Sequence, residues 1–168
     1  MKRLWVAAPC ALSLLLLPGC AAQLAPAYDQ AVAGELASAN NDIQALFVSI
    51  GPQVSATSYA SRGPAYDHIV AELNATELEI KTRPTPKLDG VSEADKMLAK
   101  LKVAGVSADP NFSDYPSARA VGDLVDTLQH MQADDQKKGL AGAEVRAYEN
   151  QAVIYLTQAI TYENFLKR

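Results

Sequence analysis

Apolar residues recur at intervals of three and four along most of this chain, and proline or glycine separates the runs. This spacing is typical of amphipathic α-helices, because the buried face of a helix repeats about every 3.6 residues. No segment alternates apolar and polar side chains for long enough to indicate a half-buried strand. The pair Asp89-Gly90 lies between predicted helices and not between strands. The sequence therefore predicts an all-α fold.

Proline and glycine also place the helix boundaries. Pro26 and Pro64 suit helix starts, whereas Gly51-Pro52 suits a stop. The predicted helices span residues 26–49, 64–82, 92–105, 116–139 and 141–167. Residues 91–138 are interpreted as one arm that the turn-rich segment 106–115 interrupts. Four arms with short connections favour an up-and-down four-helix bundle whose third arm is interrupted by a loop.

The last predicted helix carries the most regular pattern. Tyr148, Tyr155 and Tyr162 are spaced seven residues apart, and a smaller or aliphatic residue follows each of them four positions later: Ala152, Ala159 and Leu166. This is an a/d heptad pattern, which predicts a seam that packs closely against a partner helix. The three tyrosines are also the candidate face for a ligand or a protein partner, because tyrosine offers both a ring and a hydroxyl.

The N-terminus has the features of a secretory signal peptide. Lys2 and Arg3 supply positive charge, residues 4–17 are uncharged, and small residues follow. The uncharged run is shorter than the roughly 20 apolar residues that a membrane-spanning helix needs, and Pro9 interrupts it. We therefore expect residues 1–19 to be removed rather than to remain as a transmembrane helix.

The end of this segment, Leu17-Pro18-Gly19-Cys20, resembles the lipobox of bacterial lipoproteins. The resemblance implies that the Cys20 thiol receives a diacylglycerol, that a peptidase cuts between Gly19 and Cys20, and that the new amine is acylated. Pro18 stands where the family usually has alanine or serine, and it favours an extended conformation at Leu17. The alternative is ordinary signal cleavage after Ala22.

The expected organisation has three parts: a signal peptide at 1–19, the lipidated Cys20 with a short tether at 20–27, and a helical-bundle domain at 28–168. This plan resembles that of small uncharacterised bacterial lipoproteins that place one helical bundle on a lipidated cysteine. In that class, alanine after the cysteine, here Ala21, implies sorting to the outer membrane, with the domain facing the periplasm. The lipid membrane is then the first partner of the chain.

Charge and cysteine content exclude several classes of protein. Removing residues 1–19 takes two basic residues and no acidic ones, so 13 Lys and Arg and 19 Asp and Glu remain. Such an acidic domain is not expected to bind nucleic acid. Cys10 leaves with the signal peptide and Cys20 is consumed by lipid, so core packing alone must stabilise the domain.

Residues for catalysis or metal binding are sparse. Glu72 follows His68 by one helical turn, and Asp126 and Asp134 flank His130 at the same spacing. We interpret these as solvated helix faces, and we expect no metal and no cofactor. No cysteine nucleophile survives maturation, and no Gly-x-Ser-x-Gly motif occurs. The chain is therefore not expected to be an enzyme.

Two classes of function remain. The first is a non-enzymatic, membrane-anchored envelope protein that acts in interaction or assembly and docks a protein partner on a helix face. The second is a helical bundle that binds a small ligand, or less readily acts as a catalyst, through the tyrosine-lined seam.

Overall fold

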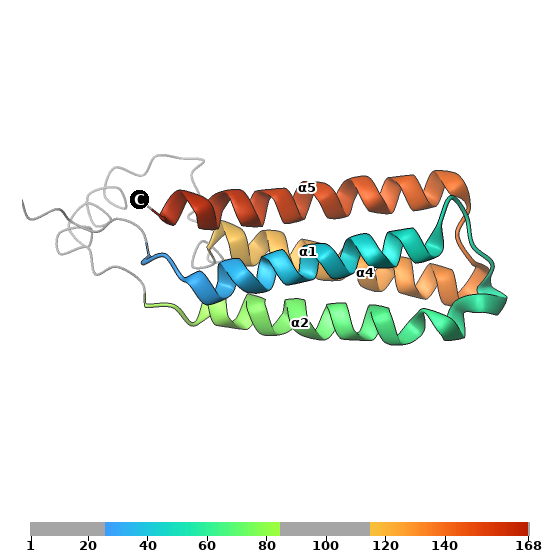
Figure 1. The fold of residues 1–168 in the computed structure, drawn as a ribbon, viewed down its shortest axis with the longest axis horizontal. Helices are drawn as coiled ribbons and strands as arrows, with labels where there is room; N and C mark the ends of the chain where they lie inside the picture. The colour runs from blue at the N-terminus through green and yellow to red at the C-terminus, as the bar shows by residue number, and fades with distance from the viewer. Residues whose placement is uncertain (1–25, 85–114, 168) are drawn as a thin grey trace, which may run out of the picture.

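The computed structural model describes residues 26–84 and 115–167, which fold into helices alone (Figure 1). The elements are α1 (Gln30–Ile50), the 3₁₀-helix η1 (Ala56–Ser61), α2 (Gly63–Lys81), α4 (Pro116–Lys138) and α5 (Gly142–Leu166). Within these ranges the pairing of extended backbone is confined to one isolated antiparallel β-bridge, between Val54 and Leu140. The prediction of an all-α fold is confirmed for the described residues.

The helix boundaries follow the proline and glycine signals closely. Three of the predicted helices, at 64–82, 116–139 and 141–167, agree with α2, α4 and α5 to within one residue at each end. The first helix begins at Gln30 rather than at Pro26, because the Asp29 carboxylate accepts a hydrogen bond from the backbone N–H of Ala31 at 2.8 Å and caps the helix. The predicted helix at 92–105 and the interruption of the third arm lie outside the described residues.

Each described helix packs against two others. α1 contacts α2 and α5, and α4 contacts the same two helices. α1 and α4 begin at the end of the molecule where α2 and α5 finish (Figure 1). All four contribute to one hydrophobic core, whose largest fully buried apolar side chains are Tyr66, Leu36, Ile43, Ile69, Leu73, Ile80, Leu124, Leu128, Met131 and Leu140.

The two ends of the molecule differ in character. At one end, which we call the bridge end, the backbone N–H of Val54 donates to the carbonyl of Leu140 at 3.0 Å, and the N–H of Leu140 donates back at 2.9 Å. At the other end, which we call the tether end, Pro26 leads into α1, α2 finishes near Arg83, and the Tyr115 hydroxyl before α4 donates to the Arg83 carbonyl at 3.5 Å.

The buried row of α5 contains the predicted alanines, but Leu156 and Glu163 are buried in the places expected for Tyr155 and Tyr162. Its members are Val145, Ala152, Leu156, Ala159, Glu163 and Leu166. The alanines are buried as the heptad pattern predicts, whereas Tyr148, Tyr155 and Tyr162 are half-buried beside the row. The seven-residue spacing predicts that the tyrosines lie in the seam, but Glu163, the residue after Tyr162, is buried instead. The Arg83 guanidinium pairs with Glu163 at 2.7 Å and makes its burial tolerable.

The fully buried Ala159 provides a test of this packing. Ala159→Leu should lower the free energy of unfolding by about 1–3 kcal/mol, because an added side chain has no room in a close-packed contact. Gln158→Ala, at the exposed neighbouring position, should cost under about 0.5 kcal/mol. Chemical denaturation of both variants measures the difference. Equal midpoints would mean that α5 does not pack through its alanine row.

Candidate functional site

The expected lipidation site, Cys20, and the residue before its cleavage point, Gly19, lie outside the described residues. The described chain starts at Pro26, which enters the fold at the tether end. None of the helices in ranges 26–84 and 115–167 combines the length and the hydrophobicity that crossing a bilayer requires.

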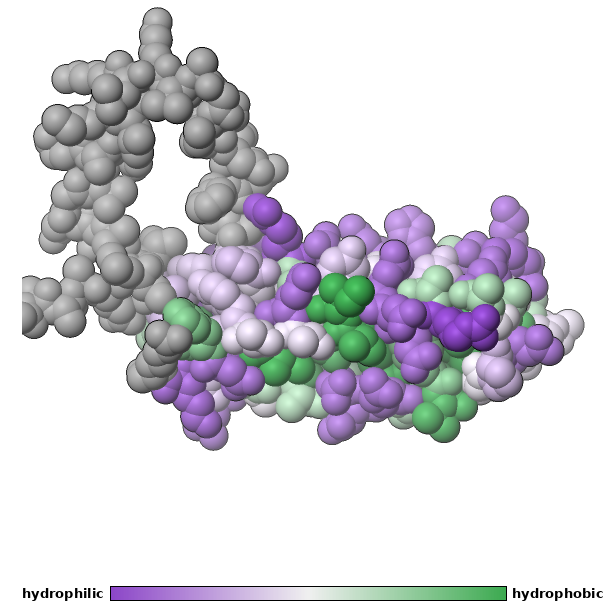
Figure 2. All heavy atoms as spheres, turned by 90° about the horizontal axis from the view of Figure 1, so that it is seen from above, coloured by the Kyte–Doolittle hydropathy of each residue, from purple (hydrophilic) through white to green (hydrophobic). Residues whose placement is uncertain are grey.

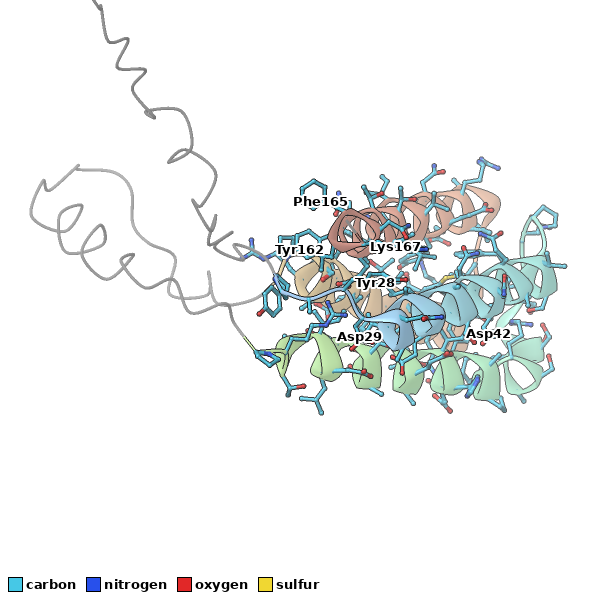
Figure 3. All side chains as sticks on the ribbon, turned by 60° about the vertical axis from the view of Figure 1, so that its left-hand side comes forward. Tyr28, Asp29, Asp42, Tyr162, Phe165 and Lys167 are labelled. Atoms are coloured by element: carbon cyan, nitrogen blue, oxygen red, sulfur yellow. The ribbon has the colours of Figure 1, made fainter. Side chains whose placement is uncertain are left out.

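Aromatic and basic side chains gather at the tether end (Figure 3). The Lys167 ammonium lies 5.8 Å from the centre of the Tyr28 ring, within the range of a cation–π interaction. Phe165 is 52 % exposed, and Tyr162 on the same helix is half-buried. Burial, and after it the charge of Glu163, raises the pKa of the Tyr162 hydroxyl, which therefore stays neutral. The chain thus presents aromatic rings and the Lys167 ammonium at the end where α1 begins.

The three sequence-predicted tyrosines lie along one side of α5, and the first reaches α4. The Tyr148 hydroxyl donates to Oδ2 of Asp134 at 2.8 Å. Burial and this hydrogen bond raise the pKa of Tyr148 to about 12, and the same bond holds the pKa of Asp134 below its usual range. Tyr148 and Tyr155 also pack against the core. The row therefore contributes to the contact of α5 with its neighbours, and part of its hydrogen-bonding capacity is already used.

The solvent side of α5 carries no charge over most of its length. From Ala147 to Phe165 its exposed residues are apolar, amide or hydroxyl in type: Ala147, Asn150, Gln151, Val153, Ile154, Thr157, Gln158, Thr161, Asn164 and Phe165. We call this set the α5 face. The same span contains two carboxylates, of which Glu149 is half-buried and Glu163 is buried. α4, in contrast, exposes Arg119, Asp123 and Asp126.

Hydrophobic side chains occupy part of the α5 face. Val153 is 47 % exposed and Ile154 is 53 % exposed. Figure 2, which looks down on α5, shows hydrophobic side chains near the middle of this side of the molecule, with polar ones around them. Protein interfaces are depleted of charged residues at their centre and polar at their rim. This face therefore fits the composition of a protein interface.

Two cavities lie elsewhere among the described residues. One, of about 290 Å³, lies between α1 and α2 and includes Asp42, Ser49, Arg62 and His68 in its lining. The other, of about 390 Å³, lies between α2 and α4 and is lined mainly by polar residues. None of the three tyrosines of α5 lines either cavity.

A buried ion pair near the bridge end has a structural role. The Arg62 guanidinium donates twice to the Asp135 carboxylate, at 3.0 and 2.8 Å, and also to the Ser58 carbonyl at 3.1 Å. The Tyr66 hydroxyl donates to the same carboxylate at 3.3 Å, and burial raises its pKa well above the usual value. Asp135 is fully buried, and its partners are Arg62, which lies between η1 and α2, and Tyr66 of α2. This cluster therefore fixes the start of α2 against the end of α4. Sequence reasoning missed it because Arg62 and Asp135 are far apart in the chain.

The second buried pair, Arg83 with Glu163, is less completely hydrogen-bonded. The two side chains are 7 % and 1 % exposed. Within the described residues, Nε and Nη2 of Arg83 and Oε1 of Glu163 are buried without a hydrogen-bond partner. Because both charges are buried at the tether end, this pair holds the end of α2 against α5.

The two histidines have different surroundings. Nδ1 of His130 is 2.8 Å from the backbone carbonyl of Asp126, while the Asp134 carboxylate turns to Tyr148 and Lys138, so the predicted Asp-His-Asp face does not converge. His68 and Glu72 lie on one side of α2, and Asp42 from α1 joins them. Sequence reasoning saw the first two and missed Asp42, because no local pattern shows which residue of another helix faces them.

Comparison with known proteins identifies no relative. No protein-family model matches the chain, and neither a curated protein nor a solved structure matches it. The function is therefore argued from the residues and from their arrangement.

Proposed function

We propose that this chain is a bacterial envelope lipoprotein, held on the membrane by an acylated Cys20, whose helical domain is a non-enzymatic interaction or assembly factor. Its partner is an envelope protein that docks on the α5 face. The observation that carries this proposal is the α5 face itself, which is uncharged and partly hydrophobic.

The layout of the tether end supports the proposed anchor. From Cys20 to Pro26 the chain can reach at most about 20 Å, because an extended residue spans about 3.3–3.6 Å. A lipid on Cys20 would therefore keep the tether end close to the bilayer. Tyr28, Phe165 and Lys167 at this end suit a membrane surface, where aromatic rings and lysine side chains sit at the headgroup level. Ala21 favours the outer membrane, with the domain facing the periplasm.

We further propose that residues 28–168 as a whole form an up-and-down four-helix bundle with an interruption in the third arm. The contacts of α1 and α4 with both α2 and α5 support this arrangement. In such a bundle the bridge end points away from the membrane, and the α5 face runs along the side of the domain, where a neighbouring envelope protein can reach it.

The alternative is a bundle that binds a small ligand through Tyr148, Tyr155 and Tyr162. It has less support, because Tyr148 already donates its hydroxyl to Asp134 and neither described cavity includes a tyrosine of the row. A protein partner uses the exposed surface beside the row and needs no cavity.

Photo-crosslinking in intact cells tests the docking face. A photoreactive amino acid at Ile154, on the α5 face, should give a discrete adduct with a second envelope protein. The same amino acid at Asp126, which is also exposed but lies on the charged side of α4, should not. Val153→Lys should abolish the adduct without unfolding the domain, because Val153 is about half exposed. Equal adducts from both positions, or none from Ile154, would remove the support for this face.

Replacing the proposed anchor tests the membrane attachment. Cys20→Ala should move the protein from the membrane fraction to the soluble fraction, because the acyl chains provide the attachment and a single weak signal does not hold a protein stably. Cell fractionation followed by a high-salt wash measures this. A Cys10→Ala variant, changed within the signal segment, is the matched control and should remain with the membrane. If Cys20→Ala also resists extraction, the lipobox interpretation is wrong.

A further inference from the structure

Three side chains that bind metals in many proteins meet between α1 and α2. His68 and Glu72 lie one turn apart on α2, so they project from the same side of the helix. Asp42 comes from α1, which packs directly against α2. Figure 3 shows Asp42 in the space between these two helices. One ligand atom from each residue can be chosen so that the three atoms all lie within 4.8 Å of one another.

The spacing of these three atoms is close to the spacing of ligand atoms around a bound cation. Nε2 of His68 is 4.0 Å from Oδ2 of Asp42. Metal–ligand bonds of about 2.0–2.2 Å in a tetrahedral site place the ligand atoms roughly 3.3–3.6 Å apart. The separations in the cluster, which are at most 4.8 Å, must therefore shorten by up to about 1.5 Å. The His68 and Asp42 side chains are 70 % and 42 % exposed, and they have the freedom to move this far.

The electrostatic surroundings favour a cation. Along the same helix pair Glu35 of α1 faces α2 and accepts a hydrogen bond from Thr76 at 3.0 Å. The nearby Glu35 charge raises the pKa of Glu79, which indicates negative potential along this side. Arg62 lines the adjoining cavity, but its guanidinium is bound to Asp135 and Ser58.

Glu72 supplies an independent observation. Its Oε2 atom is buried and has no hydrogen-bond partner. A buried carboxylate oxygen without a partner is costly, and a bound ion or water molecule would remove this cost. A cation bound to the Glu72 carboxylate would supply the compensation that the surrounding side chains do not.

We propose that Asp42, His68 and Glu72 form a binding site for a divalent transition-metal ion of the Zn²⁺ type. One imidazole and two carboxylates are a nitrogen and oxygen ligand set that Zn²⁺ accepts, whereas Mg²⁺ and Ca²⁺ prefer oxygen ligands in larger number. Three protein ligands leave a fourth position open. The adjoining cavity of about 290 Å³, which Asp42 and His68 also line, leaves room there for water or a small ligand.

Zinc titration of the full-length protein tests this site. The protein is purified in detergent, treated with iodoacetamide so that no free thiol competes, stripped with a chelator, and titrated with ZnCl₂ in a calorimeter. One equivalent should bind. His68→Ala and Asp42→Asn should each weaken binding by at least about tenfold, because even an outer-shell partner of a metal ligand is typically worth about 10–100-fold. Excess Mg²⁺ should not compete.

His130→Ala is the matched control, because His130 is also an exposed histidine beside acidic residues, and it should leave the affinity unchanged. Zinc should also shift the imidazole NMR signals of His68 and not those of His130. The proposal is overturned if Zn²⁺ does not bind saturably, or if the His130→Ala variant loses as much affinity as His68→Ala. Circular dichroism of each variant verifies that the helices remain.

Discussion

Asp135→Ala should lower the free energy of unfolding by about 3–5 kcal/mol, because it leaves the Arg62 guanidinium buried without a counter-charge. Arg62 is 5 % exposed, and both of its bonds to a carboxylate end on Asp135. The Tyr66 hydroxyl loses its acceptor in the same change. Chemical denaturation followed by far-UV circular dichroism measures this loss.

Asp134→Ala is the matched control for this experiment. Asp134 is the adjacent carboxylate, but its side chain is 37 % exposed and its partners, Tyr148 and Lys138, reach water. Solvent screening makes such a pair weak, so the variant should be far less destabilised than Asp135→Ala. Replacing both buried partners, with Arg62→Met and Asp135→Leu together, should restore most of the lost stability. Equal losses for Asp134→Ala and Asp135→Ala would show that the buried pair does not hold α2 against α4.

Gly139→Ala should be the second severe change. Gly139 has φ of 76°, which L-residues rarely adopt, and an added Cβ would lie 2.4 Å from the Val54 carbonyl oxygen and 2.8 Å from the Ala56 nitrogen. Backbone atoms cannot rotate away, so the bridge between Val54 and Leu140 must open. The expected loss is about 2–5 kcal/mol, the sum of backbone strain and the two bridge hydrogen bonds.

Gly51→Ala separates strain from crowding. Gly51 has a similar φ of 65°, but an added Cβ there would meet no atom within 4 Å. Its loss should be limited to the strain of the backbone, about 1–3 kcal/mol. Thermal or chemical denaturation of both variants should therefore show Gly139→Ala as the less stable protein. The opposite order would mean that the bridge end is not packed as described.

The helices could be predicted from sequence because their signals are local. Pro64, Pro116 and Gly139 mark helix ends, and the apolar spacing between them identifies the buried faces. α1 was misplaced at its start because Asp29, the actual cap, follows Pro26 by three residues and both residues suit a helix start.

The buried charges and the metal cluster could not be predicted, because their members come from different helices. Glu163 looks like a surface residue until Arg83 is placed beside it, and Arg62 gives no local sign that Asp135 is its partner. Likewise, His68 and Glu72 share a visible helical spacing, but Asp42 joins them only through the packing of α1 on α2. The α5 face became apparent once burial separated Glu163 from the exposed residues around it.

The proposed membrane anchor can be tested directly at the N-terminus. The protein is purified from bacterial membranes with detergent and digested, and the mass of its N-terminal peptide is measured. We expect a peptide that begins at Cys20 and carries a diacylglycerol on the thiol and an acyl chain on the amine. A peptide that begins at Met1 or at Gln23, or one in which Cys20 has a free thiol, would show that this chain is not a lipoprotein.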